Sequence, residues 1–377
     1  MKITHVVPYK LDPFSGVYTS ITGICAGLAR AGHDVELWSL SPWPAQGLEM
    51  AAELNEAGVR RIDVPPAARP WTLTRGAKQM FNQLSSDVLH LHAAFSPQNN
   101  LLLRRVNLPT VLSPHGVYTP ESLVHSKLKK QVFKGLIELP SLRRIDAVCG
   151  LTEVEAEDTR AFGYQGRIEV IPNGVSEPLS DLDDGRFRSL LGLGAGERLG
   201  LFVGRIDLHH KRIDEIAMAV AQSPGWHLAV VGPDHRGGEA RLRALIVGLD
   251  GGDRVHIIGS LRGRELGEAF AGSDLFLLLS RSEGMPMSLL EGLSHGLPAV
   301  VSPGVEHAVP VAASGAGWER EPSELSDLLG RLAADPEQLN SAQRQTKEII
   351  AGYRWDAVAA AYGDLYGSLL RGGRSRL

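Results

Sequence analysis

Short apolar runs of strand length recur along the whole chain, and each is separated from the next by a segment long enough for a helix. Strands that alternate with helices are typical of parallel sheets, because a parallel pair needs a crossover connection. The sequence therefore predicts an α/β protein with doubly wound parallel sheets. The expected strands are residues 3–8, 35–39, 59–64, 88–92, 110–113, 145–150, 168–171, 199–203, 227–233, 255–259, 275–279 and 298–302.

A polar, acidic and turn-rich segment, residues 176–185, separates the first seven of these runs from the rest. A length of 377 residues also favours about two domains. We therefore expect an N-terminal domain of residues 1–178, a second domain of residues 179–354, and a C-terminal helical segment of residues 355–377.

The composition excludes several classes of protein. A formal net charge of −4 gives no overall attraction to nucleic acid, so we expect no nucleic-acid partner. The two cysteines, Cys25 and Cys149, lie in apolar stretches and have no neighbours typical of a metal site. The sequence contains neither a signal-peptide pattern nor a run of 18 apolar residues, and we expect a cytoplasmic protein.

Two glutamates, Glu283 and Glu291, flank a turn that follows the apolar run 275–279. Glu283 is therefore expected at the carboxyl end of a strand, where open α/β sheets bind ligands. Ser288 and Glu291 have capping-box spacing, which predicts a helix that starts near Ser288 and offers free N–H groups to an anion. The simpler alternative is that Glu291 only caps its helix and Glu283 is a solvated loop acid.

Two cations follow the expected strand at residues 199–203. Arg205 could bind a phosphate through two hydrogen bonds, and Lys211 could add a point charge. Basic residues are common on surfaces, so this pair carries weight only together with other motifs. The chain has no G-x-G-x-x-G and no G-x-x-x-x-G-K-[ST] pattern, which argues against a dinucleotide oxidoreductase and a P-loop NTPase.

Histidines occur in and after the central strands of the first half. His90 and His92 alternate onto one face of a strand and suggest a metal pair, but the sequence shows no convincing third ligand. We therefore expect no metal site. His115 follows the strand at residues 110–113, and a single loop histidine is most often structural.

Residues 126–137 place basic side chains on one side of a helical pattern and apolar side chains on the other. A solvated helix face is the simpler interpretation, and attachment to an anionic membrane surface is the functional one. The basic residues are Lys127, Lys129, Lys130 and Lys134.

Taken together, these motifs resemble the retaining nucleotide-sugar glycosyltransferases of the GT-B type, family 4. The resemblance covers nearly the whole chain. It implies two Rossmann-like domains facing a central cleft, with the last helix crossing back to the first domain. The residues that carry it are Gly16, His115, residues 171–175, Arg205 with Lys211, and Glu283 with Glu291.

The resemblance also implies a role for each motif. Arg205 and Lys211 would hold the donor diphosphate, and Glu291 the ribose hydroxyls. Glu283 would bind the donor sugar, with His115 reaching that sugar from the first domain, which would bind the acceptor. The glycine at Gly16 and the backbone amides of Met287 and Ser288 would assist the phosphates, and Ser260 and Leu261 would lie near the base. Gly284 and Met285 would also belong to the donor-binding site.

The catalytic residues implied in this way are Glu283, His115, Arg205 and Lys211. The expected donor is a UDP- or GDP-sugar, and the resemblance implies neither a metal nor another cofactor. The expected acceptor is a sugar or lipid-linked glycan of cell-surface polysaccharide synthesis, with peripheral contact to the inner membrane surface. Two alternatives stay open, a sugar-nucleotide epimerase and a non-catalytic nucleotide-sugar-binding module.

Three residues depart from the family pattern. Arg212 stands where glycine usually follows the lysine, Ser176 where aspartate often follows Asn-Gly-Val, and Met285 where phenylalanine is common. None of them removes a charged contact.

Overall fold

The computed structural model describes residues 1–8, 15–41, 48–66, 69, 72–124, 133–194 and 196–372. It divides into two compact units, one formed by Met1–Gly174 with Trp355–Leu377 and the other by Val175–Arg354. The division lies just before residue 178, where we expected the first domain to end. At this division the Val175 N–H donates to the Tyr353 carbonyl over 2.7 Å, and Val175 and Arg354 form an isolated parallel bridge. The chain therefore enters and leaves the second unit through paired segments.

The first unit contains a seven-stranded parallel sheet in the order β3-β2-β1-β4-β5-β6-β7. The strand order reverses between β1 and β4, and their register places His5 opposite His90. The strands are β1 (Lys2–Val7), β2 (Asp34–Ser39), β3 (Arg60–Asp63), β4 (Val88–His92), β5 (Thr110–Ser113), β6 (Ala147–Gly150) and β7 (Arg167–Val170).

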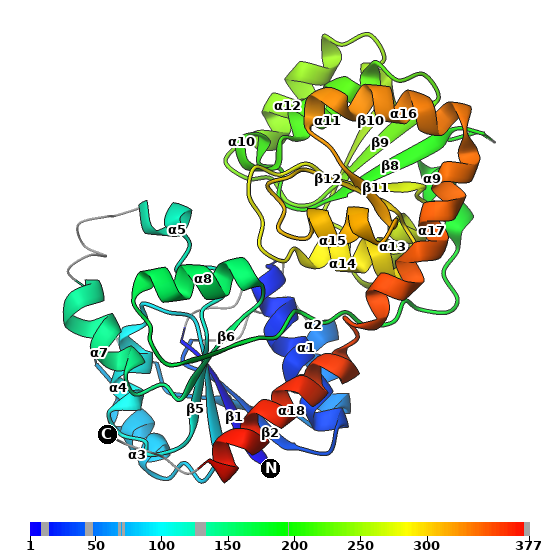
Figure 1. Cartoon of the computed structure of the whole chain (residues 1–377). Coiled ribbons are helices and arrows are strands. Elements are labelled where there is room, and N and C mark those ends of the chain that lie inside the picture. Colours follow the sequence, from blue (N-terminus) through cyan, green and yellow to red (C-terminus); the bar gives the residue numbers. More distant parts are fainter. Residues whose placement is uncertain are drawn as a thin grey trace. The chain divides into compact units, whose positions relative to one another are not determined.

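The last helix, α18 (Trp355–Arg371), packs along α1 (Gly16–Arg30) in this first unit (Figure 1). A Cβ atom on Gly23 would lie 2.1 Å from the Trp355 ring, and one on Gly174 would lie 2.3 Å from it. The two glycines therefore make the space that anchors the helix. The other helices are α2 (Leu48–Glu56), α3 (Arg75–Asn82), α4 (Pro97–Leu103), α5 (Pro120–Val124), a π-helical turn (Lys134–Glu138), α7 (Leu139–Leu142) and α8 (Glu153–Phe162).

The second unit contains a six-stranded parallel sheet in the order β10-β9-β8-β11-β12-β13, which reverses between β8 and β11. The prediction of two doubly wound parallel sheets is thus confirmed, and only the short β13 was not expected. The strands are β8 (Arg198–Val203), β9 (Trp226–Val231), β10 (Val255–Gly259), β11 (Leu275–Leu278), β12 (Ala299–Val301) and β13 (Gly317–Glu319).

Helices cover both faces of this second sheet, with α11, α12 and α16 on one side and α13, α14 and α15 on the other (Figure 1). None of the described helices of the chain is both long and apolar enough to cross a bilayer. The helices of this unit are α9 (Asp184–Leu190), α10 (Leu208–Lys211), α11 (Ile213–Ala221), α12 (Gly238–Val247), α13 (Gly263–Ala271), α14 (Met287–Ser294), α15 (Ala308–Ala313), α16 (Leu325–Ala334) and α17 (Pro336–Ala351).

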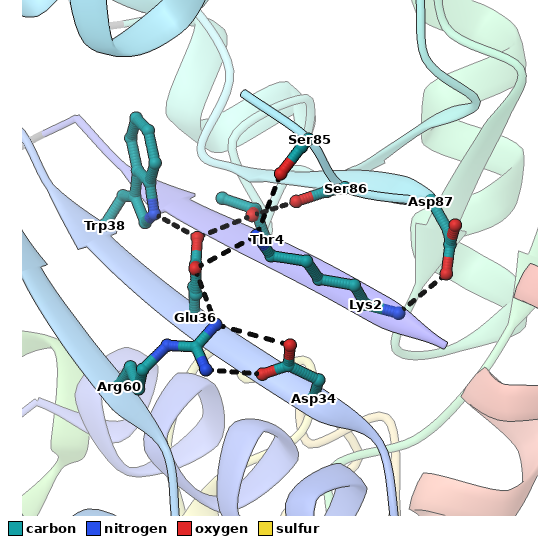
Figure 2. Close-up of polar contacts among 9 residues, drawn as sticks. All are labelled: Lys2, Thr4, Asp34, Glu36, Trp38, Arg60, Ser85, Ser86 and Asp87. Atoms are coloured by element: carbon teal, nitrogen blue, oxygen red, sulfur yellow. Dashed lines mark hydrogen bonds and ion pairs between the residues drawn. The ribbon is translucent and has the colours of Figure 1, made fainter. Parts of the chain in front are cut away.

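Glu36 on β2 is buried and surrounded by donors (Figure 2). It accepts hydrogen bonds from Trp38 Nε1 over 2.9 Å and from the Thr4 hydroxyl over 3.4 Å, and it pairs with Arg60 over 2.7 Å and Lys2 over 3.4 Å. Burial alone would raise the pKa of Glu36, but the hydrogen bonds from Arg60 and Trp38 outweigh it and lower the pKa. This carboxylate therefore fastens β1, β2 and β3 to one another.

Candidate functional site

The carboxyl edge of the second sheet gathers the predicted donor-binding residues around the reversal between β8 and β11. Open α/β sheets bind ligands at such a reversal. Arg205 follows β8 and Glu283 follows β11. The neighbouring loops after β8 and β9 approach each other closely, since a Cβ atom on Gly232 would lie 1.9 Å from the Gly204 carbonyl oxygen.

Lys211 and Glu283 form an ion pair at this edge, in which the Lys211 ammonium donates to Glu283 Oε1. Both side chains are largely buried, with 12% and 16% of their surface exposed. Lys211 ends the short helix α10, whose N-terminus is capped by Asp207 through the His210 N–H over 3.1 Å. The pair therefore joins the loops that follow β8 and β11.

Backbone hydrogen bonds fix the loop that carries Glu283. The Glu283 N–H donates to the Gly304 carbonyl over 3.0 Å, and the Glu306 N–H donates to the Glu283 carbonyl over 2.9 Å. The Arg281 N–H donates to the His210 carbonyl over 2.9 Å and ties the same loop to α10. Glu283 thus occupies a defined position before any ligand arrives.

Arg205 differs from Lys211 because its guanidinium makes no hydrogen bond or ion pair with any described residue. The side chain is exposed. An arginine at the end of a strand, with its donors unoccupied, is well suited to a diphosphate.

Helix α14 begins at Met287, one residue earlier than expected, and Pro286 is its N-cap residue. The predicted capping box is wrong, because Ser288 already lies inside the helix and no side chain of the described residues caps its N-terminus. The helix packs tightly on β11, since a Cβ atom on Gly292 would lie 3.1 Å from the Phe276 ring. Because no described side chain caps it, the positive N-terminal end of α14 is open to an anion.

Glu291 lies in α14 and is partly buried. Its carboxylate has no hydrogen-bond or ion-pair partner among the described residues, and burial raises its pKa to about 7. The simple alternative, that Glu291 caps its own helix, is excluded by this geometry. A partly buried carboxylate that no described group satisfies, with a raised pKa, is unusual in a folded protein and indicates a ligand site.

Five more of the predicted donor residues lie in the second unit, whereas Gly16 lies in the first. Ser260 and Leu261 follow β10, with Ser260 exposed and Leu261 partly buried. Gly284 is exposed in the loop after β11, whereas Met285 and Met287 are buried. The structure therefore collects them with Arg205, Lys211, Glu283 and Glu291 in loops and helix starts that follow the strands of one sheet.

His115 lies in the first unit, directly after β5, in the left-handed conformation with a φ of +55°. The Gly116 N–H donates to Glu155 Oε1 over 2.6 Å, and the Leu151 N–H donates to Glu155 Oε2 over 2.7 Å. Thr152 caps α8, since its hydroxyl oxygen accepts from the Glu155 N–H over 3.1 Å. The sequence did not reveal that the Glu155 side chain holds the His115 loop.

A chain of hydrogen-bonded histidines leads inward from His115. His115 Nε2 lies 3.0 Å from His92 Nδ1, and His92 Nε2 lies 2.9 Å from His5 Nδ1. Burial lowers the pKa of His5 to about 3 and that of His115 to about 4, and it lowers the pKa of His92 well below its usual value. All three rings are therefore neutral at pH 7. His5 was missed in the sequence because only strand register brings β1 beside β4.

His90 stacks on His92 with ring centroids 4.4 Å apart. One ligating nitrogen from each of His5, His90 and His92 lies within 4.8 Å of the others, so the strands supply the third ligand that the sequence did not show. However, both nitrogens of His92 are hydrogen-bonded to histidines, and those of His90 to Tyr366 and Ser113. A metal ion would have to displace these bonds, and the absence of a metal site stays a prediction.

Two further predictions concern the first unit. Gly16 begins α1 and is exposed, and Ser15 caps this helix through the Tyr18 N–H. Of the expected basic helix, Lys127, Lys129 and Lys130 lie outside the described residues. Lys134 lies in the π-helical turn, where its Nζ is 4.3 Å from the centroid of the Phe162 ring.

Residues 15–174 match the family model of the glycosyl transferase 4-like domain, and residues 185–349 match that of the glycosyl transferases group 1. A phosphatidyl-myo-inositol mannosyltransferase from Mycolicibacterium smegmatis is 24% identical over an alignment of 287 residues, which covers 73% of this chain and 69% of that protein.

Solved structures share the fold over nearly the whole length. Sucrose-phosphate synthase from Thermosynechococcus elongatus has a TM-score of 0.78 at 20% identity, covering 99% of this chain and 100% of that chain. HepE from Anabaena, in complex with UDP-glucose, has a TM-score of 0.77 at 18% identity, covering 98% and 100%. The chain belongs to the GT-B glycosyltransferases of the family 4 type.

One departure of this glycosyltransferase from the family pattern has a structural explanation. Arg212 replaces the usual glycine and has a φ of +53°, in the region that glycine adopts most readily. Its side chain pairs with Glu321 over 2.8 Å and with Glu215 over 3.4 Å. The turn after Lys211 therefore keeps the conformation that a glycine would favour, and two ion pairs support it.

Proposed function

We propose that this glycosyltransferase moves a sugar from a nucleoside-diphosphate sugar to a hydroxyl acceptor, with retention of configuration and without a metal ion. The observation that carries the proposal is the unpartnered Glu291 carboxylate, on a helix whose N-terminus is open. A carboxylate suits ribose hydroxyls, and a helix N-terminus suits phosphate.

The Lys211–Glu283 pair suggests how the site takes up its donor. A diphosphate carries more charge than a carboxylate and can compete for the Lys211 ammonium. Glu283 would then be free to accept hydrogen bonds from the hydroxyls of the donor sugar. Before binding, the pair keeps both side chains at the strand ends.

The chemical step breaks the bond between the anomeric carbon and a phosphate oxygen, and negative charge grows on the leaving nucleoside diphosphate. Arg205, Lys211 and the N-terminus of α14 are fixed positive groups that can stabilise this charge without a metal. The acceptor hydroxyl would attack from the face of the leaving group, form the new C–O bond and pass its proton to a phosphate oxygen. Configuration is retained in this route, and no base from the protein is required.

Similar proteins support the choice of substrates. HepE has been solved with UDP-glucose, which supports a UDP-sugar as the donor, while a GDP-sugar is the other candidate. The mycobacterial relative is named for a phosphatidyl-inositol acceptor, and WaaG is described as acting in lipopolysaccharide biosynthesis. We therefore propose a lipid-linked or glycan acceptor, bound by the first unit, and a cytoplasmic enzyme that meets the membrane surface.

The test is a screen of UDP-, GDP- and ADP-sugars for binding and slow hydrolysis in the presence of EDTA. We expect one donor to be hydrolysed by the intact protein, and the rate to fall about a hundredfold or more in Lys211→Ala and Glu283→Gln. Arg344→Ala, which removes an exposed pair with Glu337 on α17, is the control and should leave the rate unchanged.

Other outcomes would decide between the alternatives. Loss of turnover in EDTA that Mg²⁺ or Mn²⁺ restores would overturn the metal-independent mechanism. Conversion of the donor to its epimer would indicate an epimerase, and tight binding without turnover, with any acceptor tried, would indicate a binding module. NMR of the glycoside product reports whether configuration is retained.

A further inference from the structure

The histidine chain beneath His115 is not needed for donor binding in the second unit. It starts at His115, passes through His92 and ends at His5, whose Nε2 is buried and has no partner among the described residues. We propose that His5 and His92 are positioning residues that hold His115 in the tautomer with its proton on Nδ1. His115 then meets its substrate as a hydrogen-bond donor.

The number of protons allows only two arrangements of hydrogen-bond donors along the row of His5, His92 and His115. Each ring is neutral and carries one proton, and each of the two hydrogen bonds needs one proton between its nitrogens. If His115 donates from Nε2, then His92 must donate from its own Nε2, and His5 is left with its proton on Nε2. If His5 donates from Nδ1, then His92 donates from Nδ1, and His115 is left with its proton on Nδ1.

The buried end of the chain distinguishes the two arrangements. His5 is fully buried, so the first arrangement would leave an N–H group without a partner inside the protein. The second leaves only a lone pair on the same atom. Orphaned buried N–H groups are rarer in native structures than acceptors that lack a full set of partners, so the second arrangement is favoured.

His90 lies beside the chain but does not disturb this choice. Its nitrogens face the hydroxyls of Tyr366 over 2.7 Å and Ser113 over 2.8 Å. A hydroxyl can donate or accept, so these two contacts tolerate either tautomer of His90 and impose none on His92.

His115, at the outer end of the row of histidines, is the residue that would contact a substrate. His115 keeps part of its surface exposed, and its Nδ1 has no partner among the described residues. An Nδ1–H there would donate to a hydroxyl or phosphate oxygen of the substrate. This last step rests on the proposed transferase function, whereas the tautomer of the ligand-free protein does not.

The tautomer can be read directly by NMR of the full-length protein with ¹⁵N-labelled histidine rings, at pH 8 and without ligand. The His115 signals are assigned by their loss in His115→Gln. We expect Nδ1 of His115 to carry the proton and Nε2 to be bare. The opposite tautomer in the intact protein would overturn the proposal, whatever the enzyme's activity.

Two substitutions at the buried end test the coupling. His5→Leu removes the donor to His92, and we expect His115 to become a mixture of tautomers. His5→Asn places an amide N–H near the position of Nδ1 and should restore the Nδ1–H form. Tyr366→Phe is the matched control, since it removes a hydroxyl that contacts only His90 in this group of histidines, and should leave His115 unchanged.

Two more measurements complete the test. Equimolar Zn²⁺ should leave the ring signals unchanged; if it shifts those of His5, His90 and His92 together, the cluster is a metal site and the proposal fails. Once a donor is known, kcat/KM should fall about tenfold in His5→Leu, the effect of one hydrogen bond, and recover in His5→Asn. If no donor is turned over, the transferase proposal fails while the NMR result stands.

Discussion

Glu36 is a buried carboxylate and Glu291 a partly buried one, and the protein surrounds the two in opposite ways. Glu36 accepts hydrogen bonds from Trp38 and Thr4 and pairs with Arg60 and Lys2, and its pKa is lowered. Glu291 has none of these partners among the described residues, and its pKa is raised to about 7. A carboxylate that holds the fold is satisfied by the fold, so one that is left unsatisfied indicates a partner from outside.

The points at which the strand order reverses differ between the two sheets in the same way, one having its polar groups paired and the other not. The reversal in the first unit is filled by neutral histidines that bond to one another. The reversal in the second unit presents Arg205 and Glu291, which lack partners, beside the Lys211–Glu283 pair. The same doubly wound architecture thus has a neutral, internally hydrogen-bonded sheet edge in one unit and a charged edge with unpaired groups in the other. Function therefore has to be argued from the side chains and not from the fold.

The largest expected effect is on the stability of the first unit. Glu36→Ala leaves the buried Trp38 N–H without an acceptor and removes one of the acceptors of Arg60 and of Lys2, which keep Asp34 and Ser85. We expect the free energy of unfolding to fall by about 3 kcal/mol. Arg60 can regain water, since 52% of its side chain is exposed, which keeps the loss from being larger. Denaturant titration at pH 7.5 measures it.

Glu53→Ala is the control for that measurement, because Glu53 forms a more exposed pair with Arg30. It should cost less than about 1 kcal/mol. Equal losses in the two variants would show that the partners of Glu36 do not explain its structural role.

Glu291→Gln should weaken donor binding and leave stability unchanged, the reverse of the effect expected for Glu36→Ala. If Glu291 receives the ribose hydroxyls, donor affinity falls about tenfold to a hundredfold, the range for hydrogen bonds to a charged group. Stability at pH 8 should not fall, because the carboxylate has no described partner to lose. Calorimetry with the donor and denaturant titration measure the two quantities, and unchanged affinity would remove Glu291 from the site.

The pKa of Glu291 predicts a pH dependence of stability. The folded protein holds this proton up to a pH of about 7, whereas an ordinary glutamate loses it near 4.5. The stability of the intact protein relative to Glu291→Gln should therefore fall as the pH rises from about 4.5 to 7 and stay level above. We expect a total change of about 1–2 kcal/mol, because Glu291 is only partly buried.

Much of the fold was predictable because buried parallel strands are continuous apolar runs, which the sequence shows directly. β13 was not predicted because its three residues, Gly317–Glu319, are too few to form a recognisable apolar run. The helix start at Met287 was misjudged because capping-box spacing does not reveal the N-cap residue when Pro286 occupies it.

The charged residues of the candidate site could be proposed from the sequence because they lie in loops and helices that follow strands, and the ends of parallel strands meet at one edge. His5 and Glu155 were not found, since their contacts with His92 and Gly116 depend on strand register and loop conformation. A sequence pattern locates side chains along the chain, but hydrogen bonds between distant segments follow only from the folded geometry.

The smallest expected effect concerns Arg212, which extends the comparison from carboxylates to cations. Arg212 is paired with Glu321 and Glu215, whereas Arg205 has no described partner. Arg212→Ala loses both ion pairs and keeps the left-handed backbone, so it should cost about 1 kcal/mol of stability. Arg212→Gly loses the same pairs but relieves the backbone at +53°, and should be close to neutral. Thermal unfolding of the two variants measures the difference, and neither should change donor affinity more than about twofold. If Arg212→Ala lost as much donor affinity as Arg205→Ala, a cation that is already paired within the protein would also bind the ligand. The presence or absence of an ion-pair partner would then not distinguish structural charged residues from ligand-binding ones.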